Sequence, residues 1–208
     1  YPDQYLNNTI SIRLGLIMMT IAPLTVSSIN MVRTKLIQEL QHIIAHDELT
    51  SSLTRRQFLQ SVQLLQQQAK NSAQTTAFFM LDIDHFKQVN DNYGHQIGDR
   101  ALQSCVHTIQ TMLRPHDLLG RLGGEEFAIF MTDIDANTAY QAAENIRKRI
   151  SQTPIKLEQQ NDFYIQVSLG IYICEAENLH SIEHHFKQAD DALYQAKRQG
   201  RNQVVIST

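Results

Sequence analysis

The chain has 208 residues, 42% of them hydrophobic and 19% charged, which suits one ordinary domain with an extension or two small domains. Its formal net charge of −3 excludes a broad polyanion-binding surface, so we expect no nucleic acid polymer as a partner. Cys105 and Cys174 lack the spacing of metal ligands or of a disulfide framework, which favours a reduced, cytoplasmic setting.

The first 46 residues differ in composition from the rest. Residues 14–32 are apolar, carry no charge and approach the length of a membrane span, although Pro23 and several Ser and Thr residues weaken that interpretation. Arg33 and Lys35 follow at once, as on a cytoplasmic flank, so one prediction is a span that anchors the chain to the inner membrane. The alternatives are a buried core helix or strands of an upstream sensor module.

A connecting helix is predicted next. Apolar residues recur at helical spacing within 32–49, at Leu36, Leu40, Ile43 and Ile44, and this helix could pair with a copy of itself. Because the sequence starts with Tyr, we expect it to be part of a longer protein. We therefore predict an N-terminal segment over 1–46, with a helical extension, and a globular domain over 47–208.

From residue 47 onward, helical and strand patterns alternate. Helices are predicted over 55–69, 96–113, 137–150 and 182–200, the last capped by Gly200. Strand patterns occupy 76–84 and 202–207, residues 116–131 predict a hairpin around two glycines, and 163–174 predicts a strand pair or one long strand. This order indicates an α/β fold, with a central sheet flanked by helices.

Two acidic positions predict a metal site. Asp82 ends an apolar strand, and Glu125 follows the glycines of the hairpin turn, so the two meet if their strands are neighbours. A buried carboxylate is costly unless a partner offsets its charge, and oxygen ligands favour Mg²⁺, or Mn²⁺, over Zn²⁺. Asp82 alone would more often be a helix cap or a strand-end turn. Since Mg²⁺ completes its shell with water and substrate phosphates, the pair predicts a nucleotide triphosphate and phosphoryl transfer.

Five segments in order resemble the GGDEF family of diguanylate cyclases. They are DELTSSLTRR (47–56), DIDHFKQVNDNYGHQIGD (82–99), GGEEF (123–127), SLGI (168–171) and ADDALYQAKRQGRN (189–202). The resemblance implies a fold like the palm of nucleotide polymerases and nucleotidyl cyclases, with a mostly antiparallel sheet. It also implies that two GTP molecules become cyclic di-GMP and two pyrophosphates, across a homodimer because one domain supplies only half of the site.

The resemblance also implies roles for individual residues. Asp82, the backbone of Ile83 and Glu125 would ligate the metal, and Glu126 would help to activate the ribose 3′-OH. Gly123 and Gly124 would let the backbone approach GTP closely, and Asn90 and Asp99 would contact guanine. The phosphates would be bound by Lys87, Lys197 and Arg201, and further pocket contacts would come from Phe86 and His95.

Several of these residues also have plainer interpretations. Asn90 alone would be a turn former and Asp99 a cap on the following helix. A carboxylate at Asp99 would accept from N1–H and N2–H₂ of guanine, whereas it would face a lone pair at N1 of adenine. Lys197 and Arg201 could simply interact with a helix C-terminus, and Phe86 could be an ordinary core residue.

A second ligand site is predicted before the glycine turn. Arg114 and Asp117 match the R-x-x-D inhibitory motif of the family, where the product cyclic di-GMP would bind and inhibit the enzyme. The alternative is an ordinary turn containing Pro115.

The entry motif departs from the family pattern. Ser51 and Ser52 stand where the pattern has Gly-Leu, and Thr54 stands where it has Asn, which could weaken substrate binding. The alternatives to a cyclase are a silent nucleotide receptor, an enzyme making adenine-containing cyclic dinucleotides, and a dimerisation module. The intact signature argues against the receptor, and Asp99 argues against the adenine-containing products. A dimerisation module would not need Lys87, Asp82 and Glu125 together.

Overall fold

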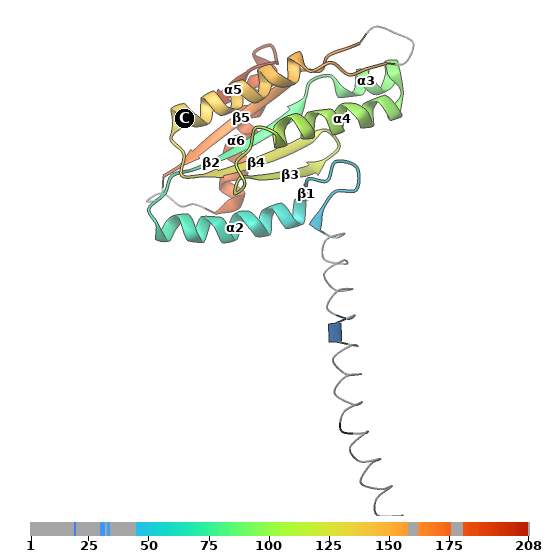
Figure 1. Cartoon of the computed structure of the whole chain (residues 1–208). Helices are drawn as coiled ribbons and strands as arrows, with labels where there is room; N and C mark the ends of the chain where they lie inside the picture. The colour runs from blue at the N-terminus through green and yellow to red at the C-terminus, as the bar shows by residue number, and fades with distance from the viewer. Residues whose placement is uncertain are drawn as a thin grey trace, which may run out of the picture. The chain divides into compact units, whose positions relative to one another are not determined.

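The computed structural model describes residues 45–157, 162–175 and 181–207, together with Met19, Asn30, Met31 and Arg33. Residues from Ile44 to Thr208 form one compact unit, which contains a six-stranded sheet with helices on both faces (Figure 1). The helices are α2 (Arg55–Asn71), α3 (Phe86–Tyr93), α4 (His95–Gln110), α5 (Ala136–Gln152) and α6 (Ile182–Arg198).

The sheet is mostly antiparallel, as the resemblance implied. Its strands are β1 (Leu53–Thr54), β2 (Thr76–Ile83), β3 (Leu118–Gly123), β4 (Glu126–Thr132), β5 (Val167–Cys174) and β6 (Val204–Ile206). Their order is β1-β3-β4-β2-β5-β6, and only the two outermost pairs are parallel. The central strand β2 lies between β4 and β5, antiparallel to both.

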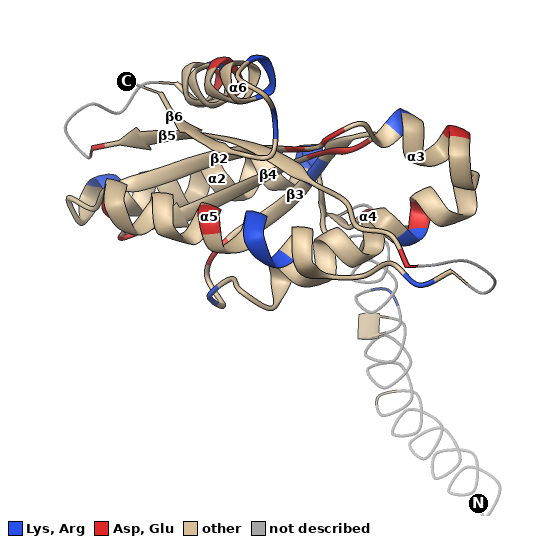
Figure 2. Ribbon diagram, turned by 90° about the horizontal axis from the view of Figure 1, so that it is seen from above, with Lys and Arg blue, Asp and Glu red and all other residues tan. Residues whose placement is uncertain are grey.

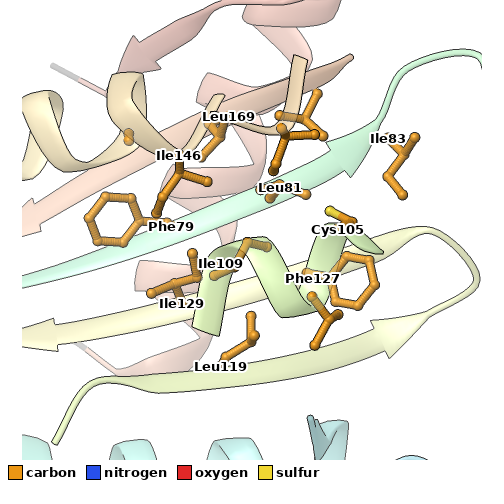
Figure 3. Packing of buried hydrophobic residues seen from close by; sticks show 14 of the residues in the cluster. Phe79, Leu81, Ile83, Cys105, Ile109, Leu119, Phe127, Ile129, Ile146 and Leu169 are labelled. Carbon is orange, nitrogen blue, oxygen red and sulfur yellow. The ribbon is translucent and has the colours of Figure 1, made fainter. Parts of the chain in front are cut away.

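Alternation along β2 divides the core into two layers. Ala77, Phe79, Leu81 and Ile83 belong to the cluster packed with α4 and α5 (Figure 3). Phe78 and Met80 belong to the cluster packed with α2 and α6. All eight residues of β2 are buried, because a central strand between two helical layers has no solvent face. The same alternation directs Asp82 toward the layer that contains α6.

Helix α6 lies directly on the backbone of β5. A Cβ on Gly170 would collide with the backbone of Leu193 and Ala189, so only glycine allows this separation. A similar approach brings Phe58 of α2 against Gly120 of β3. These contacts fix α6 over the sheet and hence the position of the basic residues at its C-terminal end.

Most predicted elements are confirmed, with small differences in bounds. The hairpin is β3 and β4, and the last helix is α6, which ends at Arg198 with Gly200 beyond it at φ 122°. The 163–174 prediction resolves into one strand, β5, while Phe163 forms only an isolated bridge with Ile155.

Two elements were not predicted. Helix α3 was missed because its sequence, FKQVNDNY, is rich in Asn and Asp and its N-cap, His85, is left-handed with no side-chain cap bond. The two-residue strand β1 is too short to leave a periodic signal, and it exists only by pairing with β3.

The predicted membrane span and most of the connecting helix lie outside the described residues. The end of that helix prediction is wrong, because His46 bridges Leu53 and residues 48–50 form a turn that Asp47 closes with hydrogen bonds to Thr50. Within the described residues, no helix has both the length and the apolar character needed to cross a membrane.

Candidate active site

Acidic side chains meet where β2 ends beside β4. Asp82 is the register partner of Glu126 on β4 and of Ser168 on β5, so these three side chains share one face. Glu125 lies in the turn just before β4, and its carbonyl accepts a hydrogen bond from Ile83 N at 3.4 Å. Figure 2 shows acidic segments gathered near this end of the sheet, beside the basic end of α6. The predicted neighbourhood of Asp82 and Glu125 is therefore present in the fold.

A lysine from α6 pairs with the most buried of these carboxylates. Lys197 Nζ lies 2.8 Å from Asp82 Oδ2, and the Asp82 side chain is only 9% exposed. Burial raises the pKa of Asp82 most strongly, Lys197 opposes that rise, and Glu125 and Glu126 add to it, so the pKa reaches about 6. The ammonium group thus supplies the positive charge that the strand end requires.

The residue types at the strand end are those that a hard divalent cation prefers. Asp82, Glu125 and the Ile83 carbonyl are oxygen donors of the kind that Mg²⁺ prefers, and the Lys197 ammonium on Asp82 is a stand-in cation. In the described part of the chain, no three His, Cys, Asp or Glu side chains converge closely enough to hold a metal unaided. A site of this kind relies on ligand oxygens to complete the shell.

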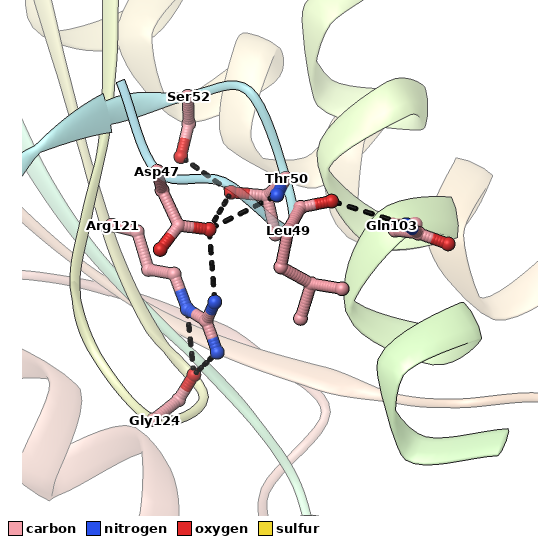
Figure 4. A network of polar contacts seen from close by, with 7 residues as sticks. All are labelled: Asp47, Leu49, Thr50, Ser52, Gln103, Arg121 and Gly124. Atoms are coloured by element: carbon pink, nitrogen blue, oxygen red, sulfur yellow. Dashed lines mark hydrogen bonds and ion pairs between the residues drawn. The ribbon is translucent and has the colours of Figure 1, made fainter. Parts of the chain in front are cut away.

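The glycine turn is supported from behind by an arginine that the sequence analysis did not single out. Gly123 and Gly124 have φ of 156° and 52°, and a Cβ on either would meet nothing within 4 Å, so conformation rather than crowding requires glycine. Arg121 donates from Nε and Nη2 to Gly124 O at 3.0 and 2.8 Å (Figure 4). This fork holds the turn that precedes Glu125.

The same arginine reaches the entry segment. Arg121 Nη1 lies 2.9 Å from Asp47 Oδ1, which also accepts from Thr50 N and Thr50 Oγ1 (Figure 4). Burial opposes ionisation of Asp47, but the bonds from Thr50 and Arg121 outweigh it and lower its pKa. A continuous polar chain therefore joins Asp47 to the glycine turn.

The predicted guanine contacts lie on α3 and α4. Asn90 is on α3 and half-buried, and a Cβ on Gly98 of α4 would collide with Asn90 Oδ1, so Gly98 admits the amide. Helix α4 begins at His95, which places Asp99 inside the helix, so the helix-cap interpretation of Asp99 is wrong. Asp99 and His95 are exposed, whereas Phe86 is buried in the core.

The other two predicted phosphate contacts come from outside the sheet. Lys87 on α3 and Arg201 after α6 are both exposed, and neither forms an ion pair with a residue in the described ranges. Arg201 has φ of 63°, and the residue after it, Asn202, donates its backbone N–H to Asp84 Oδ2 at 2.9 Å. Asp84 is buried and was not predicted as a site residue, although its place in the D-I-D sequence two residues after Asp82 was a usable signal.

The R-x-x-D residues form a separate place in the fold. Arg114 N donates to Asp117 Oδ2 at 2.8 Å and Asp117 N donates to Arg114 O at 3.0 Å, so the turn interpretation holds. Asp117 Oδ1 is buried without a hydrogen-bond partner in the described part of the chain. A cavity of about 400 Å³ adjoins it, and the entry segment supplies the opposite wall with His46, Ser51 and Leu53.

Comparisons with known proteins identify the family. The model for "Diguanylate cyclase, GGDEF domain" matches residues 44–203, so the chain belongs to this family. It is 40% identical to the probable diguanylate cyclase DgcT of Escherichia coli over 171 residues, which are 78% of this chain and 36% of DgcT. It is 37% identical to the E. coli diguanylate cyclase DgcM over 173 residues, 83% of this chain and 41% of DgcM. The chain thus spans well under half the length of these relatives.

Solved structures agree with the family assignment. The coiled coil and GGDEF domain of DgcB from Caulobacter crescentus, in complex with c-di-GMP, matches with a TM-score of 0.81 and 29% identity, covering 89% of this chain and 97% of that one. The active GGEEF domain of a Vibrio cholerae diguanylate cyclase matches with a TM-score of 0.69 and 34% identity, covering 74% and 97%.

The raised pKa of Asp82 predicts a pH-dependent stability term. Because the folded pKa of about 6 exceeds the ordinary value of 3.8, this stabilisation is fully present below pH 3.8 and is lost as the pH rises through 6. In EDTA, urea unfolding should show native stability falling by about 2 kcal/mol relative to Asp82→Asn between pH 4.5 and 7.5. Lys197→Met should move the pH midpoint of this loss of stability above 6, because the lysine opposes the rise in the Asp82 pKa. If the native chain and Asp82→Asn showed parallel curves of stability against pH, the raised pKa of Asp82 would be contradicted.

The entry motif yields a second prediction. Ser51 has φ of 58°, a left-handed conformation that costs a non-glycine residue energy, at the position where the family pattern has Gly. We expect Ser51→Gly to raise the free energy of unfolding by about 0.5–1 kcal/mol in urea titrations, because relief of strain exceeds the added chain entropy. Ser72→Gly, at φ −102°, should instead destabilise, and a loss of stability at both positions would refute the strain at Ser51.

Proposed function

We propose that this chain condenses two molecules of GTP into cyclic di-GMP and two pyrophosphates. The observation that carries the proposal is the register of β2 against β4, which sets Asp82 opposite Glu126 beneath Lys197 in a member of the diguanylate cyclase family. Carboxylates and ammonium at one strand end are the groups that metal-assisted nucleotidyl transfer needs.

The metal ligands in this proposal are Asp82, the Ile83 carbonyl and Glu125, with Mg²⁺ as the expected cofactor and Mn²⁺ as an alternative. When bound, the cation would neutralise phosphate charge and lower the pKa of the attacking hydroxyl. Lys197 would then be released from Asp82 and become available to the β- and γ-phosphates. Lys87 and Arg201, which are exposed and carry no described ion pair, would complete the phosphate contacts.

Glu126 is the proposed proton acceptor. It is exposed at the start of β4 and directly opposite Asp82, where a ribose 3′-OH bound at the strand end would reach it. The 3′ oxygen bonds to the α-phosphorus of the second GTP, the bond from that phosphorus to the bridging oxygen breaks, and pyrophosphate leaves while the proton passes to Glu126. Gly123 and Gly124 leave open space over the turn, so GTP would be able to approach the protein backbone there.

Guanine selection is assigned to α3 and α4. The Asn90 amide and the Asp99 carboxylate would pair with the base, because N1–H and N2–H₂ of guanine are donors and N1 of adenine is not. Phe86 is buried and His95 stands at the start of α4, and in this proposal both would shape the guanine pocket.

Two GTP molecules must face each other, which requires a homodimer. Each domain would bind one GTP, and a two-fold axis would bring one 3′-OH to the other α-phosphate. We further propose that residues 1–46 connect the domain to an upstream sensor or membrane segment, which would set the geometry of the pair on the cytoplasmic side.

Product feedback is assigned to Arg114 and Asp117. The buried Asp117 Oδ1 lacks a donor among the described residues, and guanine would supply one from the adjoining cavity. Because the entry segment forms the opposite wall, a bound product would contact residues that lead to the N-terminal segment.

The cyclase proposal is tested by removing the proton acceptor. Glu126→Gln should lower kcat at least about 100-fold while leaving the affinity for a non-cleavable GTP analogue within a few-fold, because the amide cannot take the proton. Cyclic di-GMP would be quantified by chromatography after incubation with GTP and Mg²⁺. Glu183→Gln, an exposed glutamate at the start of α6, is the matched control and should retain the native rate. A native rate for Glu126→Gln would exclude this role.

The feedback site gives a further prediction. Arg114→Ala and Asp117→Ala should each raise the cyclic di-GMP concentration for half-inhibition at least about tenfold, because each loses charge-assisted hydrogen bonds to the base. Initial rates without product should stay unchanged. His116→Ala, in the same turn and exposed, is the control and should be inhibited normally. Unaltered inhibition of the first two variants would exclude the motif as the product site.

A further inference from the structure

The turn after α6 holds an unusual backbone conformation. Three consecutive residues have positive φ, namely Gly200 at 122°, Arg201 at 63° and Asn202 at 43°. Glycine adopts such angles freely, but arginine and asparagine do so only at an energetic cost. A turn of this kind persists where surrounding contacts hold it, and its contacts therefore show what the chain is stabilising.

Asn202 is held from two sides. Its backbone N–H donates to Asp84 Oδ2 at 2.9 Å, and its side-chain Oδ1 accepts from Arg147 Nη1 of α5 at 2.8 Å. Asp84 is 6% exposed and its other oxygen accepts from the fully buried Ser168 Oγ at 2.8 Å. The turn is thus joined both to the end of β2 and to a helix on the opposite face of the sheet.

The Arg147 side chain, which forms the α5 arm of this turn, is itself held by an ion pair. Arg147 Nε and Nη2 donate to the two carboxylate oxygens of Glu144, each at 2.9 Å, and both side chains are about 15% exposed. A bidentate pair fixes the plane of the guanidinium, so its third nitrogen points in one direction. That direction is the Asn202 side chain, one residue beyond Arg201.

We propose that Asp84 and Arg147 act through Asn202 as positioning residues for Arg201. The inference rests on the proposed function, in which Arg201 binds the β- and γ-phosphates of GTP. Neither Asp84 nor Arg147 needs to touch the substrate. Together they keep Arg201 in its left-handed conformation and on the carboxylate side of the sheet, so the guanidinium is in place before GTP binds. Without this clamp, the turn relaxes toward ordinary negative φ and Arg201 moves away.

The test uses Arg147→Met, which removes the hydrogen bond from α5 to Asn202 without changing Asp82, Glu125 or Glu126. Titration calorimetry of the whole chain with the α,β-methylene analogue of GTP in Mg²⁺ should show affinity reduced about 3–10-fold. Arg201→Ala should weaken binding at least as much, and Arg147→Met should add less than twofold in the Arg201→Ala background, because the clamp acts only through that side chain. Arg149→Met, which removes an exposed arginine two residues further along α5, is the matched control and should remain within twofold of the native chain.

Asn202→Gly provides an independent variant. Glycine accepts positive φ and retains the N–H to Asp84, so only the arm to Arg147 is lost, and binding should weaken as in Arg147→Met. If Arg201→Ala weakens binding while Arg147→Met and Asn202→Gly do not, the clamp is wrong and the phosphate role stands. If the Arg147→Met effect persists undiminished without Arg201, Arg147 is merely structural and the inference is overturned. If Arg201→Ala has no effect, the proposed phosphate contact fails and the inference fails with it.

Discussion

Seven residue pairs set β2 against β4, ending with Asp82 opposite Glu126. The acidic site depends on this register because side chains alternate between faces with a period of two. A shift by one residue would send Asp82 into the layer of α4 and α5 and turn Phe79 and Leu81 toward α6. Since all of β2 is buried, such a shift would place a carboxylate in the larger apolar cluster, so the core itself enforces the position of the site.

The charge at the strand end is only partly balanced within the fold. Three carboxylates, Asp82, Glu125 and Glu126, stand near one ammonium, Lys197, and burial raises the pKa of Asp82 to about 6 in spite of that partner. Repulsion among the carboxylates leaves this place short of positive charge. The same lysine also has a proposed role with phosphates. A divalent cation that arrives with the nucleotide would replace Lys197 on Asp82 and so free the ammonium for the phosphates.

The sequence was most informative where a residue's surroundings are local. The apolar run before Asp82 and the glycines before Glu125 predict strand, turn and strand, and the sheet places them side by side as expected. The sequence was least informative where a contact spans the fold. Arg121 lies close to its signature turn, yet its partner Asp47 is 74 residues away, and Arg147 lies 55 residues from Asn202. No periodicity encodes such pairs. Serine also gives no indication of the left-handed φ of 58° found at Ser51.

The two distant pairs have the same physical purpose. Arg121 supports the glycine turn by bonding Gly124 O from behind, and Arg147 supports the turn after α6 by bonding Asn202. In both cases a guanidinium is paired with a carboxylate and also donates to a loop. Arg121 gives one nitrogen to Asp47 and two to Gly124 O, and Arg147 gives two to Glu144 and one to Asn202. These ion pairs are partly buried, and such pairs add little net stability because desolvation offsets the attraction. Their value is geometric, because each holds a loop at a fixed place beside the proposed substrate site.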